Sequence, residues 1–214
     1  IAGSTCIFAQ QAHPDNFHSA NKQSKASFRS PLPAVLSIKE LLQSLQKTNH
    51  VPKKSHLLYE IAGKYLDKLK IDSALFYIQK IKTISDSAGY EAGLAKYHLA
   101  KGSALFFRNK SDEVKQHLQQ AILLFTKYKN NLFLGISYHQ LARQRANNYD
   151  YTGAQQLYRQ AIPLIAAAGD VNRLQWAVHN TGRNFFFTLE LDSSVYYLSW
   201  AVKLAEQLQN KGKI

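Results

Sequence analysis

The sequence is poor in the residues that mark several common protein classes. Its 214 residues include one cysteine, five prolines, ten glycines and no methionine. These counts exclude a disulfide-stapled scaffold, a collagen-like repeat and a low-complexity chain. No apolar run approaches the roughly 20 residues that a membrane-spanning helix needs. Hydrophobic residues nevertheless make up 45% of the chain and aromatic residues 12%, which is enough to build a sizeable core.

Acidic residues are also scarce, with 14 against 27 Lys and Arg, so the formal net charge is +13. Such an excess raises the question of nucleic-acid binding. The basic residues are scattered, however, and their longest pure run is Lys53-Lys54. No helix-turn-helix recognition motif is present. We therefore expect no direct nucleic-acid contact and attribute the charge to lysines on solvated helix faces.

The N-terminal segment is expected to carry a targeting signal rather than a folded element. Residues 1–10 form an apolar run that resembles the tail of a secretory signal. Cys6 is expected to be a small apolar member of that run and not a lipid anchor, because Thr5 directly before it does not suit a lipoprotein site. Residues 11–30 are polar without periodicity, which predicts a flexible leader. We expect the protein to be exported to the periplasmic side of the inner membrane.

A leading helix is predicted over residues 31–50, as the second half of an incomplete repeat centred on 33–48. Two prolines suit its first turn, with Ser30 as the cap, and the apolar residues that follow have helical spacing. Pro52 then predicts a break before the next helix.

An internal repeat of period 40 dominates the rest of the sequence. Two columns hold small side chains, others hold apolar or aromatic ones, and a turn column holds side chains suited to cap a new helix. The small columns are Ala62, Gly102, Ala142 and Gly182, and Ala74, Val114, Ala154 and Ser194; the turn column is Asp72, Asp112, Thr152 and Asp192.

Each period predicts two antiparallel helices of about four turns that approach closely through the small columns. The fold expected is all-α: an α-solenoid of four such hairpins, with residues 210–214 starting a further repeat. The hairpins are placed at 55–87, 92–128, 132–168 and 172–209.

These columns resemble the tetratricopeptide repeat, with small residues on both helices of a hairpin and aromatic or aliphatic ones between them. The resemblance is clearest for Ala142, Ala154 and Tyr158 in the third hairpin and for Gly182 and Leu198 in the fourth. The period exceeds the family's usual length of about 34 residues, which implies longer helices and loops.

An exported array of this period also resembles the sensory region of tetratricopeptide-containing sensor histidine kinases of the Bacteroidetes type. Exported regulators with a DNA-binding C-terminus share that front end, and the residues do not separate the two. The resemblance implies a role in signal transduction. Kinase activity, and any contact with a membrane, would belong to a segment beyond the printed C-terminus.

Motifs for catalysis are missing from the sequence. It has no phosphate-binding glycine loop, nucleophile elbow or zinc-protease motif. The eight histidines show no i, i+4 pair, and the carboxylates are spread singly. His139 and His179 lie one period apart and are better explained as groove-lining residues than as metal ligands. We expect no enzyme activity, metal or cofactor in this chain.

Function is therefore expected from a surface, the concave face lined by the first helix of each hairpin. Arg143 and Arg183 recur in one inward column about 10 Å apart and could bind carboxylates bidentately; Asn180 could bind a peptide backbone. We expect a peptide or protein segment, acidic in character, as the partner; the alternative is a structural or dimerising spacer that pairs with a second copy. The candidate rows are Tyr59, Leu99, His139 and His179, then Gly63, Ser103, Arg143 and Arg183, then Leu66, Phe106, Ala146 and Phe186, with Lys96 and Trp176 in the turn before.

Overall fold

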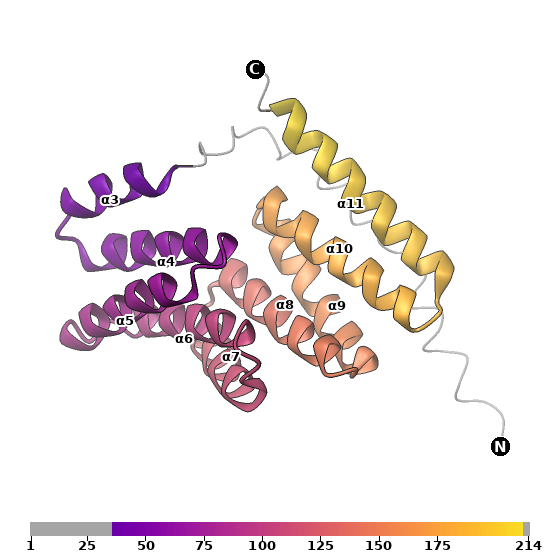
Figure 1. Ribbon diagram of the computed structural model, residues 1–214, viewed down its shortest axis with the longest axis horizontal. Coiled ribbons are helices and arrows are strands. Elements are labelled where there is room, and N and C mark those ends of the chain that lie inside the picture. The colour runs from indigo at the N-terminus through magenta and orange to yellow at the C-terminus, as the bar shows by residue number, and fades with distance from the viewer. Residues whose placement is uncertain (1–35, 212–214) are drawn as a thin grey trace.

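The computed structural model describes residues 36–211, and every regular element in that range is an α-helix (Figure 1). The expected all-α solenoid is confirmed: α4 packs on α5, α6 on α7, α8 on α9 and α10 on α11, while α3 and α11 lie at the two ends of the array. The expected signal tail and leader lie outside the described residues. The helices are α3 (Ile38–Gln46), α4 (Val51–Asp67), α5 (Ile71–Ser87), α6 (Glu91–Phe106), α7 (Ser111–Lys127), α8 (Asn131–Asn147), α9 (Tyr151–Ala167), α10 (Val171–Phe187) and α11 (Leu191–Lys211).

The leading helix begins later than the sequence predicts. Ser37 caps α3: its hydroxyl accepts from the Glu40 backbone N–H at 3.3 Å, and the Glu40 carboxylate accepts from the Ser37 N–H at 2.7 Å. This reciprocal capping box satisfies two free donors and fixes the start at Ile38 rather than near residue 33.

Both ends of the hairpin array also differ from expectation. Pro52 does not separate two helices but sits in the first turn of α4, where a missing N–H costs no hydrogen bond. The first hairpin therefore starts at Val51 instead of residue 55. At the other end, residues 210 and 211, expected to begin a further repeat, continue α11.

Every helix from α4 to α10 ends in the same turn. The turn places a residue with positive φ at regular intervals along the chain, at Leu69, Gly89, Asn109, Lys129, Tyr149, Gly169 and Leu189. After α4, the Leu69 N–H donates to the Leu66 carbonyl and the Lys70 N–H to the Tyr65 carbonyl, each at 2.9 Å. This is the Schellman arrangement, which satisfies carbonyls at a helix end. The structural unit is thus one helix with one turn, half the period seen in the sequence.

The same turn corrects the predicted capping column. Asp72, Asp112 and their equivalents lie inside the following helices rather than at their caps. The capping side chains are those of Asn130, Asp150 and Asp170, two residues earlier in the repeat. Carboxylates in the first helical turn still interact favourably with the helix dipole.

The small columns lie where paired helices approach most closely. Ala142 and Ala154 are both 0% exposed, as predicted. A Cβ added to Gly182 would lie 2.8 Å from the Leu198 Cγ and 3.0 Å from the Leu198 backbone nitrogen. The close approach of the two helices therefore depends on a side chain of minimal size at this position.

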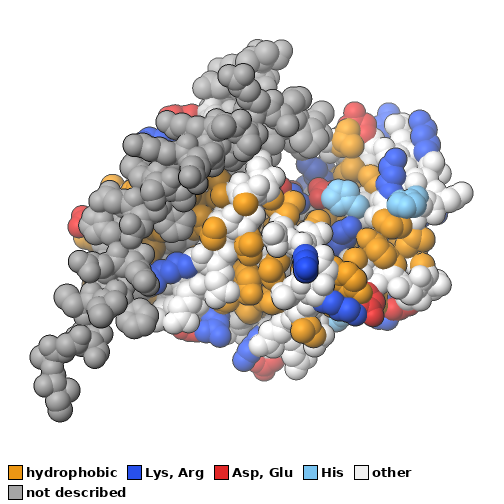
Figure 2. All heavy atoms as spheres, turned by 180° about the vertical axis from the view of Figure 1, so that it is seen from behind, with side chains coloured by type: hydrophobic (Ala, Val, Ile, Leu, Met, Phe, Trp, Pro, Cys, Tyr) orange, Lys and Arg blue, Asp and Glu red, His pale blue; other side chains and the backbone are white. Residues whose placement is uncertain are grey.

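On the described part of the face shown in Figure 2, Lys and Arg side chains are spread among polar and apolar ones rather than gathered into one basic patch.

Candidate functional site

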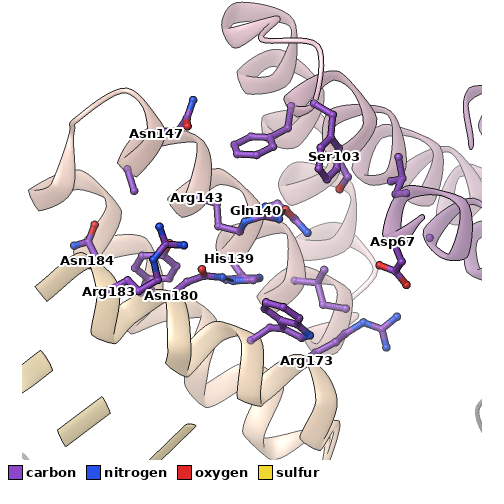
Figure 3. Close-up of a pocket in the computed structure, with 18 of the residues that line it drawn as sticks. Asp67, Ser103, His139, Gln140, Arg143, Asn147, Arg173, Asn180, Arg183 and Asn184 are labelled. Carbon is purple, nitrogen blue, oxygen red and sulfur yellow. Dashed lines mark hydrogen bonds between the residues drawn. The ribbon is translucent and has the colours of Figure 1, made fainter. Parts of the chain in front are cut away.

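The first helices of the four hairpins, α4, α6, α8 and α10, enclose a hollow of about 970 Å³. Figure 3 shows Asp67, Ser103, Arg143 and Asn180, one from each of these helices, around it. Tyr158 of α9 lies behind them and is buried. A hollow of this size, with convergent polar groups, is typical of a ligand-binding site.

Several positions of the repeat line the hollow, and three of them are spaced three and four residues apart, which places them on one helix face. The row that contains Arg143 and Arg183 lines it in all four repeats, as does the row four residues later. The lining rows are Ala100, Gln140 and Asn180; Gly63, Ser103, Arg143 and Arg183; and Asp67, Phe107, Asn147 and Phe187.

Most of the other residues chosen from the sequence also reach the hollow. Tyr59, His139 and Trp176 line it, as do Leu66, Phe106 and Ala146. Leu99, by contrast, is fully buried in the core, and Phe186 lies outside the lining while its neighbour Phe187 belongs to it.

Lys96 and His179 do not line the hollow. The Lys96 ammonium is buried and lies 5.5 Å from the centre of the Phe133 ring, and burial lowers its pKa. His179 is half-buried and packs edge-on against Trp176, with ring centres 6.3 Å apart. The rows of both residues line the hollow in other hairpins, at Trp176 for Lys96 and at His139 for His179. Local packing, rather than position in the repeat, therefore keeps these two side chains out of it.

Arg143 and Arg183 bring positive charge into the hollow. Arg143 lies over the Phe106 ring, with 4.7 Å from its guanidinium carbon to the ring centre, and donates to the side-chain amide oxygen of Gln140 at 2.9 Å. Burial lowers the pKa of Arg143, and the charge of Arg183 acts in the same direction. Within residues 36–211, neither arginine forms an ion pair with a carboxylate. Two guanidinium groups in one hollow therefore favour an anionic ligand.

His139 and Asn180 form a neutral polar pair beneath the arginines. The Asn180 amide nitrogen lies 3.0 Å from His139 Nε2. Burial, with a further effect of Arg143, lowers the pKa of His139 to about 3. The imidazole is thus uncharged at neutral pH and accepts the amide proton, which leaves the Asn180 carbonyl oxygen as an acceptor for a ligand.

Asn184 supplies a second acceptor. Its side chain lines the hollow, is 2% exposed and donates to the Tyr151 carbonyl at 2.9 Å. Its Oδ1 is buried and has no hydrogen-bond partner among the described residues. Leaving such an oxygen unpaired costs about 1–3 kcal/mol, so a ligand N–H that reached it would remove a penalty that the free protein bears.

Contacts between distant helices close one side of the hollow. Arg173 of α10 donates to the Glu60 carboxylate of α4 at 3.1 Å and also pairs with Asp170. Tyr59 of α4 packs edge-on against Phe133 of α8, with ring centres 5.2 Å apart. Burial raises the pKa of Tyr59 to about 12. The first hairpin therefore contacts the third and fourth directly.

Sequence reasoning missed five polar or charged residues of the hollow: Asp67, Gln140, Asn147, Arg173 and Asn184. It also missed apolar and aromatic ones, among them Leu69, Phe107, Tyr149, Tyr151 and Phe187. Asp67, Gln140 and Asn147 belong to the rows one turn before and after the arginine row, so extending the period-40 alignment along the helix would have found them. Arg173 and Asn184 give no such signal.

Chemistry elsewhere in the described chain is sparse. The Nδ1 atoms of His98 and His117 lie 2.9 Å apart between α6 and α7. No group of three or more His, Cys, Asp or Glu in residues 36–211 could hold a metal ion. Among the described helices, none combines the length and apolar character that crossing a membrane requires.

No known protein family matches the sequence, and no curated protein matches it. A similar solved structure is the crystal structure of BtubC (BKLC) from P. vanneervenii, with a TM-score of 0.59 and 15% sequence identity, over 89% of this chain and 78% of BtubC. Identity this low shows the fold alone: the two chains share a helical-repeat architecture.

Proposed function

We propose that the chain is a non-catalytic binding module that takes an acidic peptide or protein segment in its hollow. The observation that carries this proposal is the placement of Arg143 and Arg183 there without a carboxylate partner among the described residues. The acceptors of Asn180 and Asn184 complement the N–H groups of a peptide backbone. A carboxylate with neighbouring amide donors satisfies both sets at once.

The arginines would dominate the affinity. A charge-assisted hydrogen bond contributes about 1.5–3 kcal/mol, and a bidentate guanidinium makes two in a fixed geometry. Arg143 is held in place by Phe106 and Gln140 before any ligand arrives. Little side-chain entropy is therefore lost when a carboxylate binds to it.

Calorimetry with matched peptides tests the proposal. Each acidic peptide is compared with the same peptide in which Glu and Asp are replaced by Gln and Asn. The acidic peptides should bind to the unmodified protein, and the double variant R143Q/R183Q should bind them more than tenfold more weakly.

The control variant R159Q/K203Q removes two positive charges from exposed positions outside the hollow. It should bind the acidic peptides with unchanged affinity. Equal affinity of the wild type and R143Q/R183Q, or no binding by any acidic peptide, would overturn the proposal.

The wider setting proposed is the extracytoplasmic sensory region of a signal-transduction protein, following the resemblance to tetratricopeptide-containing sensor kinases. The apolar run at residues 1–10 and the period of 40 support it. Fractionation of cells expressing the natural gene tests the location. Recovery of the protein in the cytosol would contradict it.

A spacer that pairs with a second copy is the second candidate function, and α11 favours it. Leu191, Val195 and Val202 of this terminal helix are 55%, 64% and 58% exposed. Sedimentation equilibrium distinguishes the two functions. A dimer that V195E/V202E dissociates, together with no peptide binding, would favour the spacer.

A further inference from the structure

We infer that the mouth of the hollow binds an aliphatic or aromatic side chain adjacent to the ligand's carboxylate, so that the ligand is an acidic peptide with an apolar residue beside its acidic one. This inference rests on the proposed function and adds a second recognition element to it. It is carried by the mouth residues, a set of apolar and aromatic side chains that line the hollow at the C-terminal ends of the first helices, in the turns that follow them and at the first residue of α9: Leu69, Phe107, Tyr149, Tyr151 and Phe187.

Four of the five mouth residues are exposed, and Tyr151 is half-buried. Leu69 is 69% exposed, Phe107 42%, Tyr149 80% and Phe187 52%. Large apolar side chains that gather at the opening of a polar hollow mark a binding surface. They occur in all four repeats, and Tyr151 contacts both Tyr149 and Phe187 through its ring.

Two of these side chains are kept at positions that favour glycine. Leu69 and Tyr149 have φ values of 54° and 64°, and a left-handed conformation costs an L-residue about 1–2 kcal/mol. The same turn carries Gly89 and Gly169 after α5 and α9. These two glycines end second helices and do not line the hollow. Backbone strain alone does not mark the mouth, because Asn109, Lys129 and Leu189 also have positive φ and do not line the hollow. Leu69 and Tyr149 differ from them in that their exposed side chains line it.

The mouth adjoins the arginines. Phe187 follows Arg183 by four residues on α10, so the two side chains lie on the same helix face. Phe187 stacks on Tyr151 with ring centres 5.2 Å apart, and the Tyr151 carbonyl accepts from Asn184. Tyr149 extends this surface, since its ring centre lies 6.4 Å from that of Tyr151. A carboxylate on the arginines would thus place the adjacent ligand residue against an aromatic surface that includes Tyr149.

A localised negative charge suits the hollow better than a polyanion does. Asp67 lines the hollow, is exposed and forms no ion pair with the described residues. A phosphate backbone that tracked across the mouth would be repelled by this carboxylate. A peptide can place one carboxylate on the arginines and keep its remaining groups neutral, so we assign a peptide and not a nucleic acid.

The test uses three peptides of equal length and the intact protein. One carries Glu next to Phe, the second carries Glu next to Ser, and the third carries Gln next to Phe. The Glu–Phe peptide should bind about tenfold more tightly than the Glu–Ser peptide, the gain expected from burying an aromatic side chain in part. In L69G/Y149G this difference should fall below about threefold, while the Glu–Ser peptide binds as before.

Glycine suits both positions, so L69G/Y149G is expected to fold, and its melting curve verifies this. The control L189G makes the same substitution in an equivalent turn whose residue does not line the hollow and should keep the full difference. Equal binding of the Glu–Phe and Glu–Ser peptides by the wild type would overturn the inference and leave the proposed function standing.

Failure of both Glu peptides to bind would instead remove the proposed function itself. A thymidine oligonucleotide serves as the last arm of the test. If it binds and R143Q/R183Q abolishes that binding, the assignment to a peptide is wrong.

Discussion

Glu60 and Arg173 are 113 residues apart in the chain and form an ion pair of 3.1 Å. Glu60 belongs to the first hairpin and Arg173 to the fourth, so the pair joins the two ends of the array that encloses the hollow. Their side chains are 31% and 33% exposed. The curvature of the whole array is therefore stabilised by a contact that no single repeat contains.

Replacing Glu60 with Gln should weaken this link. A partly exposed ion pair contributes up to about 1 kcal/mol, so a double-mutant cycle with Arg173→Gln should give a coupling energy of about 0.5–1 kcal/mol. Urea unfolding of the four proteins measures it. The coupling should shrink in 1 M salt because exposed charges are screened; a coupling of zero at low salt would show that the contact is not formed in solution.

Two glycines in the middle of first helices should respond oppositely to the same substitution. Gly182→Ala should lower the free energy of unfolding by about 1–3 kcal/mol, because the new methyl group meets the backbone of Leu198. Gly63→Ala should raise it by about 0.5–1 kcal/mol, since no atom lies within 4 Å of the added Cβ and alanine favours the helix. Thermal and urea unfolding measure both; a Gly182→Ala protein as stable as the wild type would contradict the close helix approach.

The turns predict a second pair of opposite effects. Gly89→Ala should lower the free energy of unfolding by about 1–2 kcal/mol, because an alanine is strained at the φ of 60° found there. No atom lies within 4 Å of the added Cβ, so steric overlap adds nothing to this cost. Leu189→Gly removes a strained residue that is 80% exposed and should raise stability by about 0.5–1 kcal/mol, after allowance for the greater freedom of glycine in the unfolded chain. The difference in sign is the decisive readout in urea unfolding.

Stability should fall as the pH falls below about 6.5. Burial lowers the pKa of His139 to about 3 and that of His98 to about 4, whereas an unfolded histidine has a pKa near 6.5. The unfolded state therefore binds more protons between these values. Each group lowers stability by up to about 1.4 kcal/mol per pH unit in that window.

Urea unfolding at pH 7 and pH 5 tests this dependence. The loss of stability between the two should be smaller in His139→Asn than in the wild type. His50→Asn removes an exposed imidazole and serves as the control, with the wild-type loss retained. An equal loss in all three proteins would show that His139 is not buried in its neutral form.

Much of the fold could be predicted because local patterns determine it. Small residues at Ala142 and Ala154 mark the close contact within a hairpin, and a fixed period repeats that contact four times. The predicted start of α3 is too early because it relies on Ser30 as the cap, whereas the sequence itself carries the signature of a capping box at Ser37, with Glu40 three residues later. The half-period was missed because its signature is a backbone angle shared by residues as different as Leu69 and Gly89.

The sequence could predict those residues of the hollow that recur on one face of the first helices, but not the contacts between distant hairpins. The row of Arg143 and Arg183 follows from the repeat and lines the hollow in every hairpin. The ion pair of Glu60 with Arg173 does not follow, because it depends on the sum of small rotations between hairpins. The burial of Lys96 has the same origin: a ring from another hairpin, that of Phe133, lies over its ammonium group.

The same turn ends first and second helices alike, as at Leu69 and Gly89. Only an insertion or deletion of an even number of helices therefore preserves which helices line the hollow. Duplicating or deleting one helix with its turn would keep the spacing of every cap, yet it would exchange the roles of all helices beyond that point. Residues that now face the hollow would then lie on the convex side. The insertion or deletion of a whole helix pair keeps the same residues facing the hollow. During evolution the array can therefore gain or lose one complete hairpin at a time and retain its binding face.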